Sequence, residues 1–271
     1  MPPMNALSLA KMLRAVTCPE YSVRQLIKRL SIGSLDFRLA VGALDRAEYA
    51  FGVQGAVYLA SKLGHKDVSV IEFGVAEGAG LLTLERYASE FGRRAGVEVE
   101  VYGFDTGVGL PDPVPDYRDL PYVWKKGAYQ MDVPKLKAKL RSARLILGNV
   151  EETIPRFLTT DHAPIGFISF DLDYYSATAA AFRIFAECDS GLLPRVICYF
   201  DDIVSDEHQF HCDRVGELLA IRTFNESAGP CQTIAPIYPL RTNVVFPAQW
   251  MQQLWAYHRF NHPDYNTYIG Q

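Results

Sequence analysis

Four acidic side chains stand where two short apolar stretches of the sequence end, and they are Asp171, Asp173, Asp201 and Asp202. The stretches before them, 165–170 and 196–200, have the composition of buried strands. The ends of two neighbouring strands lie only about 4.8 Å apart. Carboxylates gathered at that spacing raise the pKa of at least one of them unless a cation lies between them. We therefore expect a hard divalent cation here, and Mg²⁺ suits oxygen ligands.

The spacing of the four aspartates assigns them different roles. We predict Asp171, Asp201 and Asp202 as metal ligands. Asp173 would stay free as a general base, because residues two apart in extended backbone share a face, so that one can hold the metal while the other reaches a substrate hydroxyl. An open alternative is that these acids cap helices or form turns after the strands.

Other metal-binding residue types lie just beyond, in the sequence DEHQFHCD. Its His208, His211 and Cys212 have no second cluster of ligands elsewhere in the chain that would complete a tetrahedral zinc site. We interpret this segment as the start of a helix near the cleft, with His208 as a candidate substrate contact.

A glycine-rich loop follows an earlier apolar stretch, 68–71. It reads Glu72-x-Gly74-x-x-x-Gly78-x-Gly80 and leads into a helical pattern. Strand, glycine loop and helix in this order are a context for binding nucleotide-like ligands, because glycines allow a tight turn and a close approach of backbone N–H groups. The carboxylate of Glu72 would repel a pyrophosphate but attract a cationic ligand. The loop therefore favours S-adenosylmethionine (SAM) over NAD, with an ordinary βα turn as the open alternative.

Two later strand ends would complete the nucleoside site. The predicted strand 97–104 runs into Asp105, 25 residues after Gly80, which is close to the spacing of about 20 expected between a glycine loop and a ribose-binding acid. A turn-forming aspartate is the alternative. The predicted strand 144–147 ends near Asn149 and Val150, where an adenine ring would lie. The full set of cofactor-binding candidates is Glu72, Gly74, Gly78, Gly80, Asp105, Thr106, Asn149, Val150 and Asp171.

Aromatic side chains are the candidates for substrate contact. The segment 111–129 is rich in proline and aromatic residues, and such long irregular segments of compact domains are often lids or binding loops. It supplies Tyr122 and Trp124, and Tyr174 is a further candidate beside the aspartates. A mobile surface loop is the open alternative for the segment.

The elements that must position these side chains follow an α/β pattern. Residues 1–64 show helical periodicity, and we expect an extension that packs on the sheet or caps the cleft, with an oligomerisation arm as the alternative. Residues 65–271 would form the domain that holds the site, with strands and helices alternating around a parallel sheet. The final two strands are predicted at 233–235 and 243–246, and the aromatic segment 250–268 receives no assignment.

Composition argues against several other classes of protein. The 271 residues are 49% hydrophobic and 21% charged, with a formal net charge of −4, which gives no electrostatic basis for nucleic-acid binding. No apolar run approaches the roughly 20 residues that span a bilayer, and the N-terminus lacks the pattern of a signal peptide. Five cysteines without a C-x-x-C pair indicate reduced thiols, so we expect a cytoplasmic protein.

The order of the motifs resembles the macrocin O-methyltransferase family. The segments are IEFGVAEGAG, VYGFDTGVGLP, WKKGAY, LGNVEETIPRFL, SFDLDYYSAT and ICYFDDIV. The resemblance implies SAM- and magnesium-dependent methylation of sugar hydroxyls on natural products, with Mg²⁺ on Asp171, Asp201 and Asp202 and with Asp173 as the base. Two features depart from the family pattern: Leu172 stands where glycine is usual, and the loop ends in Glu-Gly-Ala-Gly rather than Gly-Gly-Ser.

These observations together predict a Rossmann-like class I methyltransferase fold, with a mostly parallel seven-stranded sheet between helices and a helical N-terminal region. The predicted activity is transfer of a methyl group from SAM to a hydroxyl of a small molecule or sugar, with Mg²⁺ as a second cofactor. A homo-oligomer is an open option. A catalytically inactive SAM-binding protein and a dinucleotide-dependent oxidoreductase are the alternatives.

Overall fold

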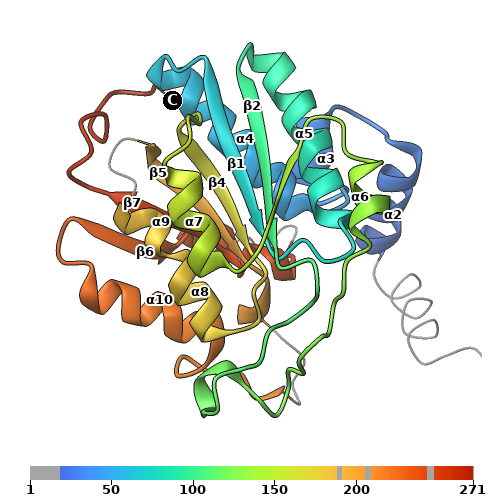
Figure 1. Cartoon of the computed structure of the whole chain (residues 1–271). Coiled ribbons are helices and arrows are strands. Elements are labelled where there is room, and N and C mark those ends of the chain that lie inside the picture. Colours follow the sequence, from blue (N-terminus) through green and yellow to red (C-terminus); the bar gives the residue numbers. More distant parts are fainter. Residues whose placement is uncertain (1–18, 188–190, 205–208, 243–246, 271) are drawn as a thin grey trace, which may run out of the picture.

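The structure is a computed structural model that describes residues 19–187, 191–204, 209–242 and 247–270. Its centre is a seven-stranded sheet with strand order β3-β2-β1-β4-β5-β7-β6 (Figure 1). Neighbouring strands are parallel from β3 to β5, and β7 is antiparallel to both β5 and β6. The strands are β1 (Asp67–Phe73), β2 (Glu98–Asp105), β3 (Arg144–Leu147), β4 (Ile165–Phe170), β5 (Leu192–Phe200), β6 (Gln232–Pro236) and β7 (Leu254–Arg259). The predicted mostly parallel seven-stranded sheet is confirmed.

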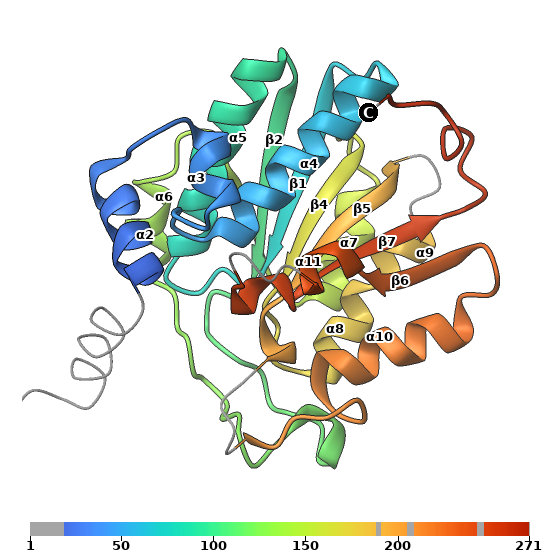
Figure 2. The same cartoon turned by 180° about the vertical axis from the view of Figure 1, so that it is seen from behind.

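Helices cover both faces of this sheet. One face carries α4 (Ala47–Leu63) and α5 (Ala79–Ala95), with α2 (Pro19–Leu30) and α3 (Leu35–Ala40) beside them (Figure 2). The other face carries α7 (Val150–Leu158), α8 (Tyr175–Ala181), α9 (Arg183–Glu187) and α10 (Gly216–Ser227). Shorter elements are α6 (Val133–Lys137), α11 (Tyr238–Arg241), η1 (Tyr117–Asp119), η2 (Asp201–Ile203) and η4 (Gln249–Met251).

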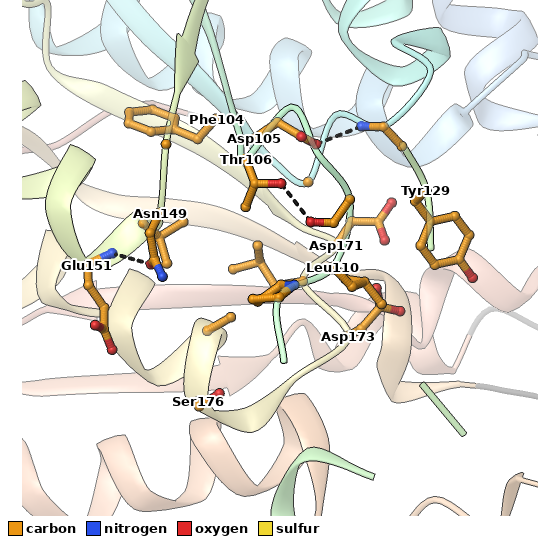
Figure 3. Close-up of a pocket in the computed structure, with 18 of the residues that line it drawn as sticks. Phe104, Asp105, Thr106, Leu110, Tyr129, Asn149, Glu151, Asp171, Asp173 and Ser176 are labelled. Carbon is orange, nitrogen blue, oxygen red and sulfur yellow. Dashed lines mark hydrogen bonds between the residues drawn. The ribbon is translucent and has the colours of Figure 1, made fainter. Parts of the chain in front are cut away.

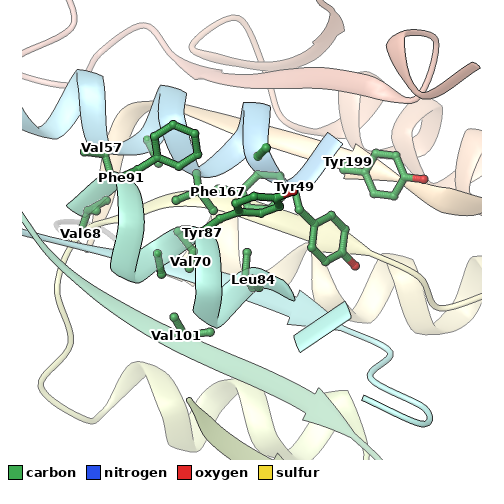
Figure 4. Close-up of a cluster of buried hydrophobic side chains, with 14 of the residues drawn as sticks. Tyr49, Val57, Val68, Val70, Leu84, Tyr87, Phe91, Val101, Phe167 and Tyr199 are labelled. Carbon is green, nitrogen blue, oxygen red and sulfur yellow. The ribbon is translucent and has the colours of Figure 1, made fainter. Parts of the chain in front are cut away.

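The central strands are apolar on both sides because helices cover both of their faces. All six residues of β4 are buried. On one face, Val68 and Val70 of β1 pack with Phe167 beneath α4 and α5 (Figure 4). On the other face, Ile71 and Phe73 belong to a second cluster that includes side chains from α7 and α10. This two-sided core explains the continuous apolar runs from which the strands were predicted.

Helix α4 lies unusually close to the sheet. A Cβ atom on Gly52 would lie 2.2 Å from the ring of Phe167 in β4, and one on Gly55 would lie 2.3 Å from the Cδ1 atom of Ile197 in β5. Glycine at both positions therefore lets the helix approach the strands. The last helix of the N-terminal region thus shares one core with the sheet, while the domain boundary after residue 64 stays a prediction.

The C-terminal strands differ in part from the sequence prediction. Residues 233–235 lie in β6 as expected, whereas 243–246 lie outside the described residues. The seventh strand is β7, in the aromatic segment 250–268 that received no assignment. None of the described helices is long and apolar enough to cross a membrane. The cysteines within the described ranges, Cys198, Cys212 and Cys231, are free thiols.

Candidate functional site

A cavity of about 490 Å³ opens where the parallel strands end at their carboxyl edge (Figure 3). The loops that follow β1, β2, β3, β4 and β5 all contribute to its wall. The sequence-predicted residues that line it are Gly74, Asp105, Thr106, Asn149, Val150, Asp171, Asp173 and Asp201. Candidates from five separate strand ends, four of them with polar side chains, therefore meet at one place, as expected for a parallel sheet.

The glycine loop is shaped by close contacts rather than by flexibility. Gly74 has φ +83°, and a Cβ atom there would lie 1.7 Å from the carbonyl oxygen of Asp171, so no other residue fits. Gly78 and Gly80 do not line the cavity. A Cβ atom on Gly78 would meet Leu136, and one on Gly80 would lie 1.8 Å from the carboxylate of Glu72. These two glycines therefore allow the start of α5 to pack against its neighbours.

Asp105 ties two loops together at the end of β2. Its Oδ2 atom accepts hydrogen bonds from the backbone N–H groups of Val75 and Ala76, both at 2.9 Å, and its Oδ1 atom accepts one from Gly107 at 2.6 Å. Asn149 acts in a similar way as the N-cap of α7, where its side chain accepts from Glu151 N–H at 3.0 Å. We call the part of the cavity formed by Gly74, Asp105, Thr106, Asn149 and Val150 the loop end.

Glu72 lies beneath the glycine loop and outside the cavity wall. Its side chain is 2% exposed, and its Oε1 atom accepts a hydrogen bond from the hydroxyl of Tyr49 at 2.6 Å. The Tyr49 oxygen in turn accepts from the hydroxyl of Ser169 at 3.0 Å. The Oε2 atom of Glu72 has no hydrogen-bond partner among the described residues. Burial raises the pKa of Glu72 to about 8, because a buried carboxylate loses the solvation of its charge.

The second part of the cavity is lined by Asp171, Asp173 and Asp201. Asp202 and Glu217 lie behind this wall, joined to it by the hydrogen bond from Asp173 N–H to Asp202, and we call the five residues together the acidic end. One carboxylate oxygen from each of Asp171, Asp201 and Asp202 lies within 4.8 Å of the other two. Burial, followed by the charge of its neighbours, raises the pKa of Asp171 and of Asp202 well above the ordinary range. The three predicted metal ligands are therefore close enough to share one cation.

Asp173 has an unusual backbone conformation for a non-glycine residue. Its φ is +60°, and its N–H group donates a hydrogen bond to Oδ2 of Asp202 at 2.9 Å. Burial, and next the charge of Asp171, raises the pKa of Asp173 to about 7. Backbone strain of this kind persists where surrounding contacts enforce it, and it clusters at functional sites. The hydrogen bond to Asp202 is one such contact.

Sequence reasoning missed several residues of the site, and Glu217 and Tyr129 are two of them. Glu217, in the first turn of α10, is 1% exposed, and its Oε2 atom accepts a hydrogen bond from the N–H of Asp202 at 3.1 Å. Tyr129 lines the cavity and also has a left-handed backbone, with φ +60°. Glu217 belongs to no motif, and Tyr129 ends the segment WKKGAY without being singled out there, because each reaches the site only through the packing of a distant segment. The one signal for Tyr129 was its place at the end of the aromatic segment 111–129.

The aromatic substrate candidates lie outside the cavity wall. Tyr174 is 1% exposed and donates a hydrogen bond to the carbonyl of Pro111 at 3.1 Å. Tyr122 is exposed and donates to the carbonyl of Gln209 at 2.9 Å. The ring of Trp124 lies 6.4 Å from that of Tyr129, measured between centroids, and so stands one residue behind the wall. His208 lies outside the described residues.

The fold is shared with known methyltransferases. No protein-family model and no curated protein sequence matches the chain. Among solved structures, it is similar to CalS11, a calicheamicin methyltransferase, with a TM-score of 0.54 and 20% identity, over 91% of this chain and 94% of that chain. It is also similar to the O-methyltransferase NovP, with a TM-score of 0.53 and 14% identity, over 79% of this chain and 80% of that chain. The chain therefore has the Rossmann-like methyltransferase fold that the sequence predicted, and the likeness at these identities concerns the fold alone.

Proposed function

We propose that this protein is a SAM-dependent O-methyltransferase that acts on a hydroxyl group of a small molecule or sugar. The observation that carries the proposal is one cavity that joins the loop end, with Gly74 and Asp105, to the acidic end, with Asp171, Asp173 and Asp201. A nucleoside fits the first part, and a hydroxylated acceptor with a cation fits the second. The fold shared with CalS11 and NovP supports the same function.

The loop end offers the contacts that an adenosyl group requires. The Oδ1 atom of Asp105 accepts one N–H within the described contacts, which leaves a lone pair for a ribose hydroxyl. Phe104, Leu172 and Val150 give the neighbouring wall an apolar surface suited to an adenine ring. Glu72, beneath the glycine loop, has a pKa of about 8, and a cationic donor bound beside it would lower that pKa again, so that its negative charge would favour this donor over a pyrophosphate.

The acidic end fits a hard divalent cation. Asp171, Asp201 and Asp202 offer only oxygen ligands, and their approach within 4.8 Å would leave unbalanced negative charge without a cation. Mg²⁺ held by these three carboxylates would orient an acceptor hydroxyl and lower its pKa. The N–H of Asp202 donates to Glu217, so Glu217 would help to fix the orientation of this ligand.

Asp173 is the residue we assign as general base. A pKa of about 7 lies near neutral pH, where a base can both exist in its ionised form and accept a proton effectively. Its carboxylate would take the proton of the acceptor hydroxyl as the oxygen bonds to the methyl carbon. Holding the acceptor oxygen about 3–3.5 Å from that carbon would supply much of the acceleration. We propose that Tyr129, Trp124, Tyr122 and His208 contribute to the acceptor side.

Binding and transfer measurements test this proposal. Isothermal titration of the full chain should show binding of SAM and no binding of NAD. Methyl transfer to a panel of hydroxylated small molecules and sugars should require Mg²⁺ and stop in EDTA. A chain that binds NAD but not SAM would contradict the proposed function, and full activity in EDTA would contradict the metal site. Binding of SAM without transfer to any acceptor would favour the inactive SAM-binding alternative.

A further inference from the structure

Arg46 occupies a position that local structure disfavours for an arginine. It is the N-cap of the 17-residue helix α4, with φ +45° and ψ +61°, and its side chain makes no capping hydrogen bond. The left-handed backbone costs about 1–2 kcal/mol for a residue with a Cβ atom. A positive charge at the N-terminus of a helix also opposes the helix dipole. An arginine retained against both effects points to a role for its charge.

Arg46 lies close to the polar groups below the glycine loop. Its guanidinium carbon lies 5.1 Å from the ring centroid of Tyr49, and the Tyr49 hydroxyl donates to Glu72 at 2.6 Å. Within the described part of the chain, the side chain of Arg46 forms no hydrogen bond and no ion pair, whereas its backbone carbonyl accepts from the N–H groups of Tyr49 and Ala50. Burial lowers the pKa of Arg46, but the nearby acidic groups together raise it by more, so the net shift is upward. These groups are Tyr49, Glu72, Glu48 and Asp171. Apart from its contact with the Tyr49 ring, the Arg46 guanidinium is therefore a charged group with no hydrogen-bonded or ion-paired partner among the described residues.

Glu72, at the hydroxyl of Tyr49, likewise has an oxygen atom without a hydrogen-bond partner among the described residues. Glu72 is 2% exposed, and the unpartnered atom is its Oε2. The Arg46 guanidinium thus lies over the ring of Tyr49, and the Glu72 carboxyl group accepts from its hydroxyl. Both groups keep unused hydrogen-bonding atoms, and both lie near the carboxyl end of β1. The N-terminus of α4 adds a partial positive charge on the side of Arg46. This arrangement complements a zwitterion, whose ammonium and carboxylate are adjacent.

We propose that Arg46 binds the α-carboxylate of the methyl donor while Glu72 binds its α-ammonium group. This inference rests on the proposed function, since SAM carries such an amino-acid end. The N-terminal region, through the N-cap residue of α4, would then be part of the cofactor site rather than only a cover over it. Arg46 would also select SAM against nucleosides that lack the carboxylate.

Titration of the full chain with SAM and with decarboxylated SAM, which lacks only the α-carboxylate, tests the inference. The variants are Arg46→Gln, which keeps a long polar side chain, and Arg46→Asn, which suits the left-handed backbone and so should fold at least as well. Arg86→Gln is the matched control, because the Arg86 guanidinium also lies over a tyrosine ring, 4.8 Å from the centroid of Tyr87, but away from the cavity.

Wild type and Arg86→Gln should bind SAM about 10- to 100-fold more tightly than decarboxylated SAM, the effect expected for one charge-assisted hydrogen bond. Both Arg46 variants should bind the two ligands with nearly equal affinity, and Arg46→Lys should restore part of the preference. A preference for SAM that persists in Arg46→Gln and Arg46→Asn overturns the inference and leaves the proposed function intact. Failure of the wild type to bind SAM overturns both.

Discussion

The two ends of the cavity are stabilised in opposite ways. At the loop end, both carboxylate oxygens of Asp105 accept backbone N–H groups, and Asn149 caps α7, so the polar groups already have partners. At the acidic end, burial and mutual repulsion raise the pKa of Asp171 and Asp202, and Glu217 keeps an unpartnered Oε1 atom among the described residues. The first end is preorganised, whereas the second requires a positive charge to complete it.

The largest effect should come from removing the proposed base at the acidic end. Asp173→Asn should lower kcat by about 10²- to 10⁴-fold, the usual contribution of a general base. Asparagine suits the φ of +60° and keeps the N–H group that donates to Asp202. The Kd for SAM, measured by titration, should stay within about twofold of wild type because of the distance to the loop end. Turnover close to that of wild type would exclude Asp173 as the base.

Added Mg²⁺ should raise the Tm of the protein, and this increase should depend on the carboxylates of the acidic end alone. At 100 times its Kd, a bound ion stabilises a protein by about 2.7 kcal/mol, or roughly 5–10 °C in Tm for a chain of this size. This shift should disappear in the double variant Asp201→Asn/Asp202→Asn, which should be at least as stable as wild type without metal because repulsion is relieved. Asp105→Asn, at the loop end, should keep the shift. A shift that survives in the double variant would contradict the metal site.

The preorganised loop end should tolerate no added bulk. Gly74→Ala combines a left-handed backbone with a clash against the carbonyl of Asp171. Gly64→Ala is a matched control, because Gly64 has the same φ of +83° and nothing within 4 Å of its added Cβ atom. Gly64→Ala should cost about 1–2 kcal/mol, and Gly74→Ala about 1–3 kcal/mol more, with loss of SAM binding. Urea denaturation measures both, and equal values would show that the loop yields without cost.

The smallest effect concerns the pH dependence of stability from Glu72. Its pKa is about 8 in the folded protein against an ordinary value of 4.5, so the folded state holds a proton that the unfolded state releases. Its stabilising contribution is therefore present at acid pH and lost as the pH rises toward about 8. Tm measured with saturating Mg²⁺, which neutralises the acidic end, should fall less steeply between about pH 5 and 8 in Glu72→Gln than in wild type. Identical slopes would contradict the shifted pKa.

The sequence was most informative where function and local structure coincide. Asp105, Asp171 and Asp201 each follow an apolar stretch, and parallel strands bring such ends together without further information. The same logic does not separate residues that face a ligand from residues that support the loop. For this reason the sequence pattern groups Glu72, which lies beneath the glycine loop, and Gly80, in the first turn of α5, with Gly74, which lines the cavity.

Other features could not be predicted because they depend on tertiary packing. Glu217 looks like an ordinary acid in the first turn of a helix until α10 is placed beneath Asp202. Arg46 gives no signal in the sequence, since its left-handed backbone depends on how α4 docks on the sheet. Strand β7 has no strict alternation, since its two buried residues, Leu254 and Tyr257, are three apart and the others are partly buried, so its period did not identify it as a strand.

The position of β7 has a consequence for how the protein is made. This strand, late in the sequence, lies between β5 and β6, and Gln253 just before it donates a hydrogen bond to the carbonyl of Asp201 at 2.6 Å. During synthesis, β5 must therefore wait with an unpaired edge until more than fifty further residues have left the ribosome. A nascent chain interrupted before residue 253 could already close most of its hydrophobic core, yet it would lack the support beneath one of its proposed metal ligands.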